Sequence, residues 1–205
     1  MKKKTFDTRQ LAMLGLLAGV LLIMAYTPLG YLNIGPLAIT FNIIPVALAA
    51  ITLGPAGGAA AGAIFGLTSF LQCIGVGGVS AMGVILFNIN PVFAFIQRFV
   101  PRVLDGFLLG YIYQAARKLK GTHFGCFVTG FCSAFLNTLF FMTALVVLFG
   151  STEYMQELIG GRNIIIFMCS FVGVNAVCEM VASTVITGAV GYALGKAGLL
   201  YTRKK

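Results

Sequence analysis

The chain has 205 residues, of which 59% are hydrophobic and only 9% are charged, and its mean hydropathy is +0.98. A soluble domain of this size cannot cover so much apolar surface, so the composition excludes a soluble fold and predicts an integral membrane protein. The net charge of +9 would suggest a nucleic-acid partner in a soluble protein, but the basic residues stand in short clusters at the ends of apolar runs, which argues against that partner. We expect an all-α fold with one transmembrane domain over residues 1–205, including short basic tails at 1–8 and 196–205.

Apolar windows of about 20 residues, the length that crosses a bilayer, predict a bundle of six transmembrane helices. The first helix is expected to run from Arg9 to Tyr31. We expect it to be retained rather than cleaved as a signal peptide, because no small-x-small site follows the apolar run. The second and third helices share residues 40–75, with a break at 53–58, where Leu-Gly-Pro-Ala-Gly-Gly is typical of a tight turn. Each half is short for a full crossing.

The second half of the chain alternates loops and long apolar runs. A glycine-rich segment, 75–83, and the following residues 87–91 predict an external loop or a short interfacial helix. The three remaining transmembrane helices are expected over residues 91–116, 124–149 and 163–194. Pro101 predicts a kink in the first of these, because proline cannot donate the helical hydrogen bond.

Basic clusters predict the orientation of the helices. They comprise Lys2, Lys3, Lys4 and Arg9; Arg117, Lys118 and Lys120; and Lys196, Arg203, Lys204 and Lys205. The positive-inside rule places all three clusters, and therefore both termini, in the cytoplasm. Six crossings from an inside start put residues 117–123 inside and 150–163 outside. The 150–163 loop holds Glu153, Glu157 and Arg162 and has no positive excess, so charge and helix count agree.

Four ionisable residues interrupt these apolar stretches: Arg98, Arg102, Asp105 and Glu179. A charge at membrane depth costs about 2.5–3.5 kcal/mol on insertion scales, and such residues usually face a bundle interior or a water-filled cavity. Counting at ~1.5 Å per residue from the outer helix ends, Arg102, Asn137 and Asn175 lie at similar depth. The convergence of these three side chains predicts a pocket for a small, polar, anionic ligand.

The residue types suggest how such a pocket binds its ligand. An arginine presents a fork of donors that matches a carboxylate, and an asparagine both donates and accepts hydrogen bonds. The candidate substrate-binding residues are Arg102, Asn137, Asn175, Asn88, Asn90, Arg98 and Phe141, with Phe93 and Phe140 as further apolar walls. In the alternative, Arg102 pairs with Asp105 or Glu179 and the asparagines join helices. Both acids are expected to act as counter-charges, and Arg98 has the alternative of extending to the outer interface.

Small residues at helical spacing form two stripes. Ala12, Gly15 and Gly19 form the first, and Gly58, Gly62 and Gly66 form the second. Such stripes let helices approach closely, either inside one protein or between two. Internal packing is the default reading, and the first stripe is also a candidate for docking a partner.

Other motifs are absent from the sequence. We find no phosphate-binding G-x-x-x-x-G-K-[ST] loop, no H-E-x-x-H and no serine–histidine pair, so we expect neither an ATP site nor an enzyme. The cysteines lack C-x-x-C spacing, and the only histidine, His123, lies beside a basic loop, so we expect no metal site.

Several segments together resemble one family of membrane proteins. Residues 39–46 (Ile-Thr-Phe-Asn-Ile-Ile-Pro-Val), 53–58, 65–70 (Phe-Gly-Leu-Thr-Ser-Phe) and 101–104 (Pro-Arg-Val-Leu), followed by Gly106, are similar in order and spacing to the S components of energy-coupling factor vitamin transporters. The pantothenate-type branch is the most similar. The resemblance implies a multi-pass substrate-binding subunit in the cell membrane that captures a vitamin from outside and topples to deliver it.

The resemblance also implies partners and a ligand. The partners are a transmembrane coupling subunit and two cytoplasmic ATPases, which use the ATP, while this chain binds no cofactor. The family docks through spaced alanines on its first helix, whereas here the four-residue step from Ala12 reaches Leu16, and Gly15 and Gly19 carry the stripe. Pantothenate would place its carboxylate at Arg102. The alternatives are another vitamin, such as riboflavin, folate or cobalamin, and a self-contained secondary carrier or channel for a small anionic solute.

Overall fold

The fold is described from a computed structural model, which describes residues 7–33, 38–78 and 80–202. In these residues the chain forms α1 (Thr8–Tyr26), β1 (Tyr31–Asn33), β2 (Ala38–Thr40), α2 (Ile43–Leu71), the 3-10 turn η1 (Gln72–Ile74), α3 (Ala81–Ile89), α4 (Pro91–Lys120), α5 (Thr122–Phe149), α6 (Glu153–Ile159) and α7 (Ile164–Lys196). The terminal basic residues Lys2, Lys3, Lys4, Arg203, Lys204 and Lys205 lie outside the described residues.

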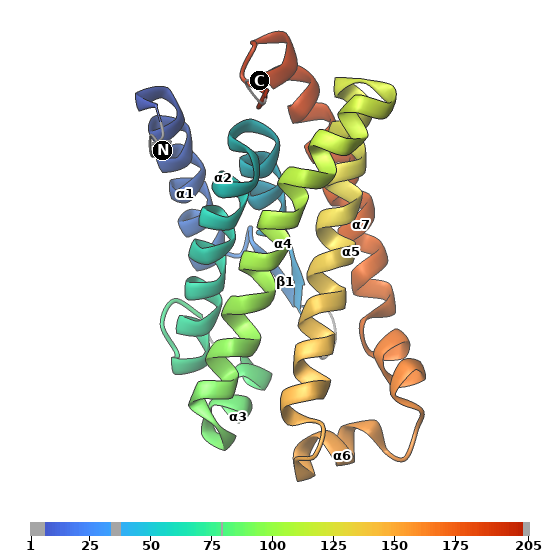
Figure 1. Ribbon diagram of the computed structural model, residues 1–205. Coiled ribbons are helices and arrows are strands. Elements are labelled where there is room, and N and C mark those ends of the chain that lie inside the picture. The colour runs from blue at the N-terminus through green and yellow to red at the C-terminus, as the bar shows by residue number, and fades with distance from the viewer. Residues whose placement is uncertain (1–6, 34–37, 79, 203–205) are drawn as a thin grey trace, which may run out of the picture.

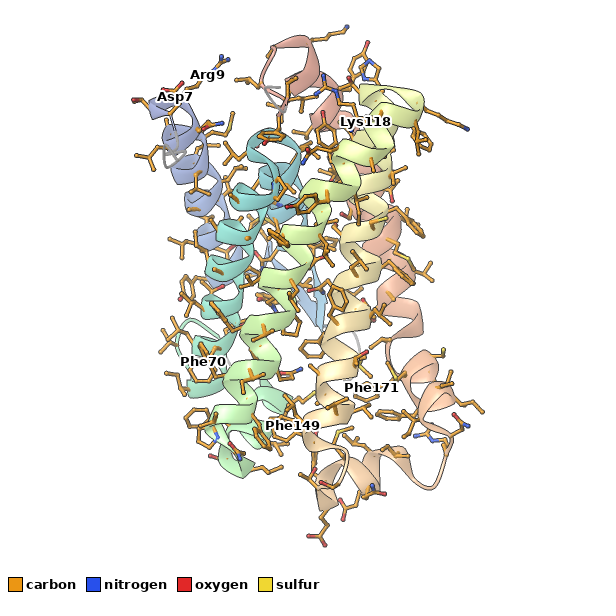
Figure 2. The ribbon with its side chains drawn as sticks, in the orientation of Figure 1. Asp7, Arg9, Phe70, Lys118, Phe149 and Phe171 are labelled. Atoms are coloured by element: carbon orange, nitrogen blue, oxygen red, sulfur yellow. The ribbon has the colours of Figure 1, made fainter. Side chains whose placement is uncertain are left out.

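The long helices form one bundle whose two ends differ (Figure 1). Both termini lie at one end, and α3 and α6 lie at the other. Figure 2 shows Arg9 and Lys118 at the terminal end, with Phe70, Phe149 and Phe171 toward the opposite end. Within the described residues, four segments are long and apolar enough to span a bilayer, namely 8–26, 43–74, 122–149 and 175–196. The predicted all-helical membrane architecture is therefore observed, with a small β-hairpin added.

The first helix is shorter than predicted. It begins at a capping box in which the Asp7 side chain and Gln10 satisfy backbone N–H groups at the helix start. It ends at Tyr26 rather than Tyr31, because Pro28 disfavours helical backbone before it and has no N–H to donate. The chain then turns into the hairpin, where β1 and β2 pair antiparallel and Tyr31 lies opposite Thr40.

The predicted turn at 53–58 divides α2 into two helical arms. Gly54 has φ 75° and ψ −165°, a conformation that glycine adopts at low cost, and Pro55 starts the second arm. The two arms lie side by side, since a Cβ built on Gly58 would lie 3.0 Å from the Cβ of Ala50. The first arm, 43–53, is about 16 Å long at 1.5 Å per residue, which is too short to cross a bilayer.

The second arm of α2 packs directly on α4 through the second glycine stripe. A Cβ added to Gly58 would lie 2.1 Å from the carbonyl oxygen of Gly106, and one on Gly62 would lie 2.1 Å from that of Arg102. Gly66 meets the backbone of α4 one turn further on. The two backbones are thus in contact with no side chain between them, which confirms the prediction of internal packing for this stripe.

Helices α5 and α7 are close together at the terminal end of the bundle. The hydroxyls of Ser133 and Ser183 are hydrogen bonded at 2.8 Å, and Gly130 lies against the carbonyl of Ser183. At the other end, the first turn of α7 is largely exposed, with Ile165 at 70%. The predicted external loop at 150–163 contains the short helix α6, and the predicted loop or interfacial helix before α4 is α3. For the helices that follow the hairpin in the chain, the predicted boundaries lie within a few residues of those observed.

Candidate ligand-binding site

A cavity of about 580 Å³ lies between the helices. Its size falls within the range of about 300–1,000 Å³ that is usual for sites of small ligands. Helices α4, α5 and α7, the end of α1, the hairpin, η1 and the start of α3 all contribute to its wall. Its polar lining comprises Tyr26, Thr27, Tyr31, Thr40, Gln72, Ser80, Arg98, Arg102, Asn137, Thr138, Asn175 and Glu179.

Arg102 lies in the cavity wall and is only 5% exposed. Its Nη1 donates to the carbonyl oxygen of Arg98 at 2.9 Å, and its buried Nε has no hydrogen-bond partner among the described residues. In the described part of the chain Nη2 makes no hydrogen bond and is not fully buried, so its N–H groups are open to the cavity. No carboxylate of the described residues lies within 4.0 Å of the guanidinium, so the alternative of an ion pair with Asp105 or Glu179 finds no support.

Two aromatic rings lie close to the Arg102 guanidinium. Its central carbon lies 4.6 Å from the ring centroid of Phe65 and 5.2 Å from that of Phe141. Contacts of this kind attract a cation to the face of a ring and hold the planar group in place. Phe141 also lines the cavity, as the sequence predicted for its apolar wall, and its ring lies 5.3 Å from the guanidinium carbon of Arg98.

Arg98 lies one helical turn nearer the α3 end of α4 and is 7% exposed. Its Nη2 donates to the Ser80 hydroxyl at 3.1 Å and its Nη1 donates to the Ser69 hydroxyl at 3.4 Å. The alternative in which Arg98 extends to the outer interface is therefore wrong. Both terminal nitrogens are already engaged, so Arg98 contributes positive charge to the cavity with fewer open donors than Arg102.

The two asparagines predicted at the depth of Arg102 also line the cavity. Asn137 of α5 is 5% exposed, and its buried Oδ1 accepts no hydrogen bond within the described residues. Asn175 lies in the facing wall on α7 and is partly exposed. The structure thus brings together the side chains of Arg102, Asn137 and Asn175, which come from three different helices.

Four other predicted residues lie elsewhere. Asn90 caps α4, where its Oδ1 accepts from the backbone N–H groups of Val92 at 3.0 Å and Phe93 at 3.1 Å. Asn88 is exposed on α3, and the Phe93 side chain is 39% exposed. Neither these residues nor Phe140 belong to the described lining of the cavity.

The two membrane-depth acids differ in position. Asp105 is 2% exposed and lies one turn beyond Arg102 on α4, outside the cavity lining, where its Oδ1 has no hydrogen-bond partner in the described chain. Glu179 of α7 is 5% exposed and lines the cavity. Its Oε1 accepts the backbone N–H of Thr40 at 2.7 Å, so this carboxylate joins α7 to the hairpin.

Sequence reasoning missed three groups in and around the wall. Tyr31 and Thr40 belong to the short hairpin, whose three-residue strands are too brief to show a periodic pattern. Phe65 was treated only as part of a family-like segment. Ser80 was detectable, because a serine just before the apolar run that starts at Ala81 is typical of a helix N-cap, and its hydroxyl does accept from the Gly83 N–H at 3.2 Å.

No group of three metal-ligating side chains gathers anywhere in the described residues. The cavity lining instead combines two guanidiniums, one carboxylate, neutral hydrogen-bonding groups and aromatic walls. Long apolar helices around a cavity with a polar lining are typical of membrane proteins that handle small polar solutes.

Comparison with known proteins identifies the family. Residues 9–191 match the family described as "ECF transporter, substrate-specific component". The chain therefore belongs to the substrate-specific components, or S components, of energy-coupling factor transporters, and is a membrane transport subunit rather than an enzyme. S components of this family associate with an energy-coupling module whose ATPase subunits use ATP.

Two curated relatives extend over most of the chain. The "Pantothenate transporter PanT" of Leuconostoc mesenteroides subsp. mesenteroides is 29% identical over 178 residues, covering 83% of this chain and 81% of the relative. The "Pantothenic acid transporter PanT" of Lactococcus lactis subsp. cremoris is 24% identical over 208 residues, covering 96% of this chain and 97% of the relative.

Proposed function

We propose that this S component binds pantothenate in the 580 Å³ cavity. The observation that carries the proposal is the Arg102 guanidinium, which is held beside two aromatic rings, has no carboxylate partner among the described residues and keeps donors open to the cavity. A buried cation without an anion is costly, and a ligand carboxylate would offset that cost with strong charge-assisted hydrogen bonds. The names of the two relatives support this choice of ligand.

The remaining chemistry of pantothenate matches the lining. Its carboxylate binds Arg102, with the positive charge of Arg98 one turn away. Its amide and hydroxyls are available to the amide groups of Asn137 and Asn175, which both donate and accept. Its dimethyl carbon packs against Phe141. Asn88 and Asn90, which lie outside the described lining, have no place in this site.

We propose that the chain crosses the membrane six times with both termini in the cytoplasm. The six crossing segments are α1, the hairpin together with the short first arm of α2, the second arm of α2, α4, α5 and α7. Charge supports this orientation, because Arg117, Lys118 and Lys120 end α4 at the terminal end of the bundle, whereas α6 at the opposite end carries Glu153 and Glu157. The cavity then faces the outside of the cell.

The proposed partners are a transmembrane coupling subunit and two cytoplasmic ATPases, and the proposed contact surface is the outer face of α1. Ala12 and Gly15 are exposed there, and neither Gly15 nor Gly19 has another atom within 4 Å of a built Cβ. The flanking Leu16 is 63% exposed. A helix face of small and apolar residues permits close approach of a second helix in a membrane.

Titration calorimetry of the detergent-purified chain tests the ligand. We expect saturable binding of pantothenate at one site per chain and no competition by riboflavin. Reconstitution tests the class, since the chain alone should not transport in proteoliposomes, and transport should require the partner subunits and ATP. Transport by the chain alone would identify a self-contained carrier and overturn the proposal, and absence of pantothenate binding would overturn the choice of vitamin.

A further inference from the structure

Glu179 places an acidic group in a cavity otherwise suited to an anion. A ligand carboxylate near Glu179 would be repelled, so a role as a counter-charge to Arg102 is the simplest alternative. No ion pair within 4.0 Å joins the two side chains among the described residues, so any attraction between Glu179 and Arg102 acts without direct contact. Glu179 is 5% exposed, lines the cavity and makes no direct ion pair with another described residue.

The backbone of the hairpin fixes the orientation of this carboxylate. Oε1 accepts the Thr40 N–H at 2.7 Å, a short bond of the charge-assisted kind. Thr40 is paired with Tyr31 in the hairpin, and both residues line the cavity. One oxygen of Glu179 is thus committed to the protein, and the side chain is not free to rotate away from the cavity.

The second oxygen, Oε2, has no hydrogen-bond partner within the described residues, and it is not among the fully buried atoms that lack one. Because the residue lines the cavity, the accessible surface of Oε2 faces the ligand space. A carboxylate oxygen that has no hydrogen-bond partner in the protein can accept from an O–H or N–H group of a ligand.

We propose that Glu179 is a specificity-determining residue that accepts a hydrogen bond from a hydroxyl group of the ligand. The inference rests on the proposed function and extends it to the end of the ligand remote from the carboxylate. The cavity then selects a ligand with two different ends. Its anionic end binds the guanidiniums of α4, and its hydroxyl end binds Glu179 of α7. A ligand with an anionic group at each end is rejected, because its second charge would meet Glu179 without a compensating cation.

The proposal is tested by pairing a change in the protein with a change in the ligand. The ligands are pantothenate and its analogue without hydroxyls, N-(3,3-dimethylbutanoyl)-β-alanine, and binding is measured by calorimetry. A hydrogen bond to a charged group is typically worth a factor of about 10 to 100 in affinity, so we expect wild-type protein to prefer pantothenate by at least about tenfold. In Glu179→Ala this preference should fall to about one- to threefold.

The conservative variant Glu179→Gln separates recognition from anchoring of the hairpin. Its amide oxygen can still accept the Thr40 N–H while its NH₂ group faces the cavity, so we expect a folded protein with a reduced preference for the hydroxylated ligand. Loss of the hairpin anchor alone would weaken both ligands equally and leave their ratio unchanged. Asp105→Asn is the matched control, because it also converts a buried acid to an amide but lies outside the cavity lining, and it should keep the wild-type ratio.

The outcomes are distinguishable. If wild-type protein binds pantothenate and the ratio of affinities stays the same in Glu179→Ala and Glu179→Gln, the role of Glu179 is overturned and the proposed function stands. If wild-type protein binds neither compound, the proposed function itself fails. If Glu179→Ala does not fold, Glu179→Gln alone decides, with an unchanged ratio counting against the proposal.

Discussion

The two sides of α4 are built in opposite ways. Toward α2, Gly106 meets Gly58 backbone to backbone, and no side chain separates the helices. Toward α5 and α7, Arg98 and Arg102 project into a cavity of about 580 Å³. The glycine contact uses the absence of side chains to fix the position of α4, and that fixed backbone holds two long cationic side chains at a defined place. Rigid packing on one face thus supports the proposed binding site on the other.

Substitutions should destabilise the protein more at the glycine contact than on the cavity side of α4. Gly62→Leu would place a Cβ 2.1 Å from the Arg102 carbonyl oxygen, which is part of the α4 backbone and has no flexible end that can yield. We expect a loss of stability of about 3 kcal/mol or more, with little folded, monodisperse protein in detergent. Thermal unfolding followed by size-exclusion chromatography measures this.

Gly15→Leu on α1 is the matched control for this substitution, because nothing lies within 4 Å of a Cβ at that position. It should leave the thermal midpoint within a few degrees of wild type. Equal stability of Gly62→Leu and Gly15→Leu would show that the contact between α2 and α4 is looser than described.

The cavity side should tolerate substitution but lose affinity. Arg102→Ala is expected to weaken pantothenate binding by about 100-fold, because truncating one partner of a buried, hydrogen-bonded charge pair costs about 2–5 kcal/mol. Its thermal midpoint without ligand should not fall, since the guanidinium makes one hydrogen bond to the protein and has no carboxylate partner in the described residues. Calorimetry together with thermal unfolding measures both quantities.

A smaller effect is expected from the neutral polar wall. Asn137→Ala should weaken pantothenate binding by about five- to tenfold, the value of a typical neutral hydrogen bond. Asn90→Ala should instead leave affinity unchanged and lower stability by about 1 kcal/mol, because Asn90 caps α4. If Asn90→Ala lost as much affinity as Asn137→Ala, Asn90 would belong to the binding site after all.

Substitutions on the outer face of α1 should not change the affinity for the ligand. Gly15→Leu and Gly19→Leu are expected to keep wild-type affinity for pantothenate but to recover less coupling subunit in a co-purification, because a larger side chain prevents close helix approach. Full recovery of the coupling subunit with both variants would remove this face from the proposed interface.

The contrast between the two sides of α4 also explains how far sequence reasoning reached. The glycine stripe at 58, 62 and 66 and the turn at Gly54 are local signals, since small residues at helical spacing and a Gly-Pro pair have few other structural uses. The convergence of Arg102, Asn137 and Asn175 followed from counting residues along helices of known rise. Helix geometry therefore carried these predictions across three elements.

The parts that were not predictable depend on non-local or irregular structure. The hairpin that brings Thr40 to Glu179 leaves no periodic trace in the sequence, whereas the end of α1 at Tyr26 follows from Pro28, a local signal that the prediction overlooked. The expected roles of Asn88 and Asn90 came from their position in a loop, which does not reveal that Asn90 faces its own helix start. The Arg98 side chain points inward because it donates hydrogen bonds to the hydroxyls of Ser69 and Ser80. These two serines belong to other segments of the chain.

The most direct measurement compares pantothenate with pantothenol, in which a hydroxymethyl group replaces the carboxylate, on wild-type protein and on Arg102→Ala. We predict that wild-type protein prefers pantothenate by about 100-fold and that Arg102→Ala binds the two compounds with nearly equal affinity. A preference that persists undiminished in Arg102→Ala would show that the carboxylate binds elsewhere and would contradict the account.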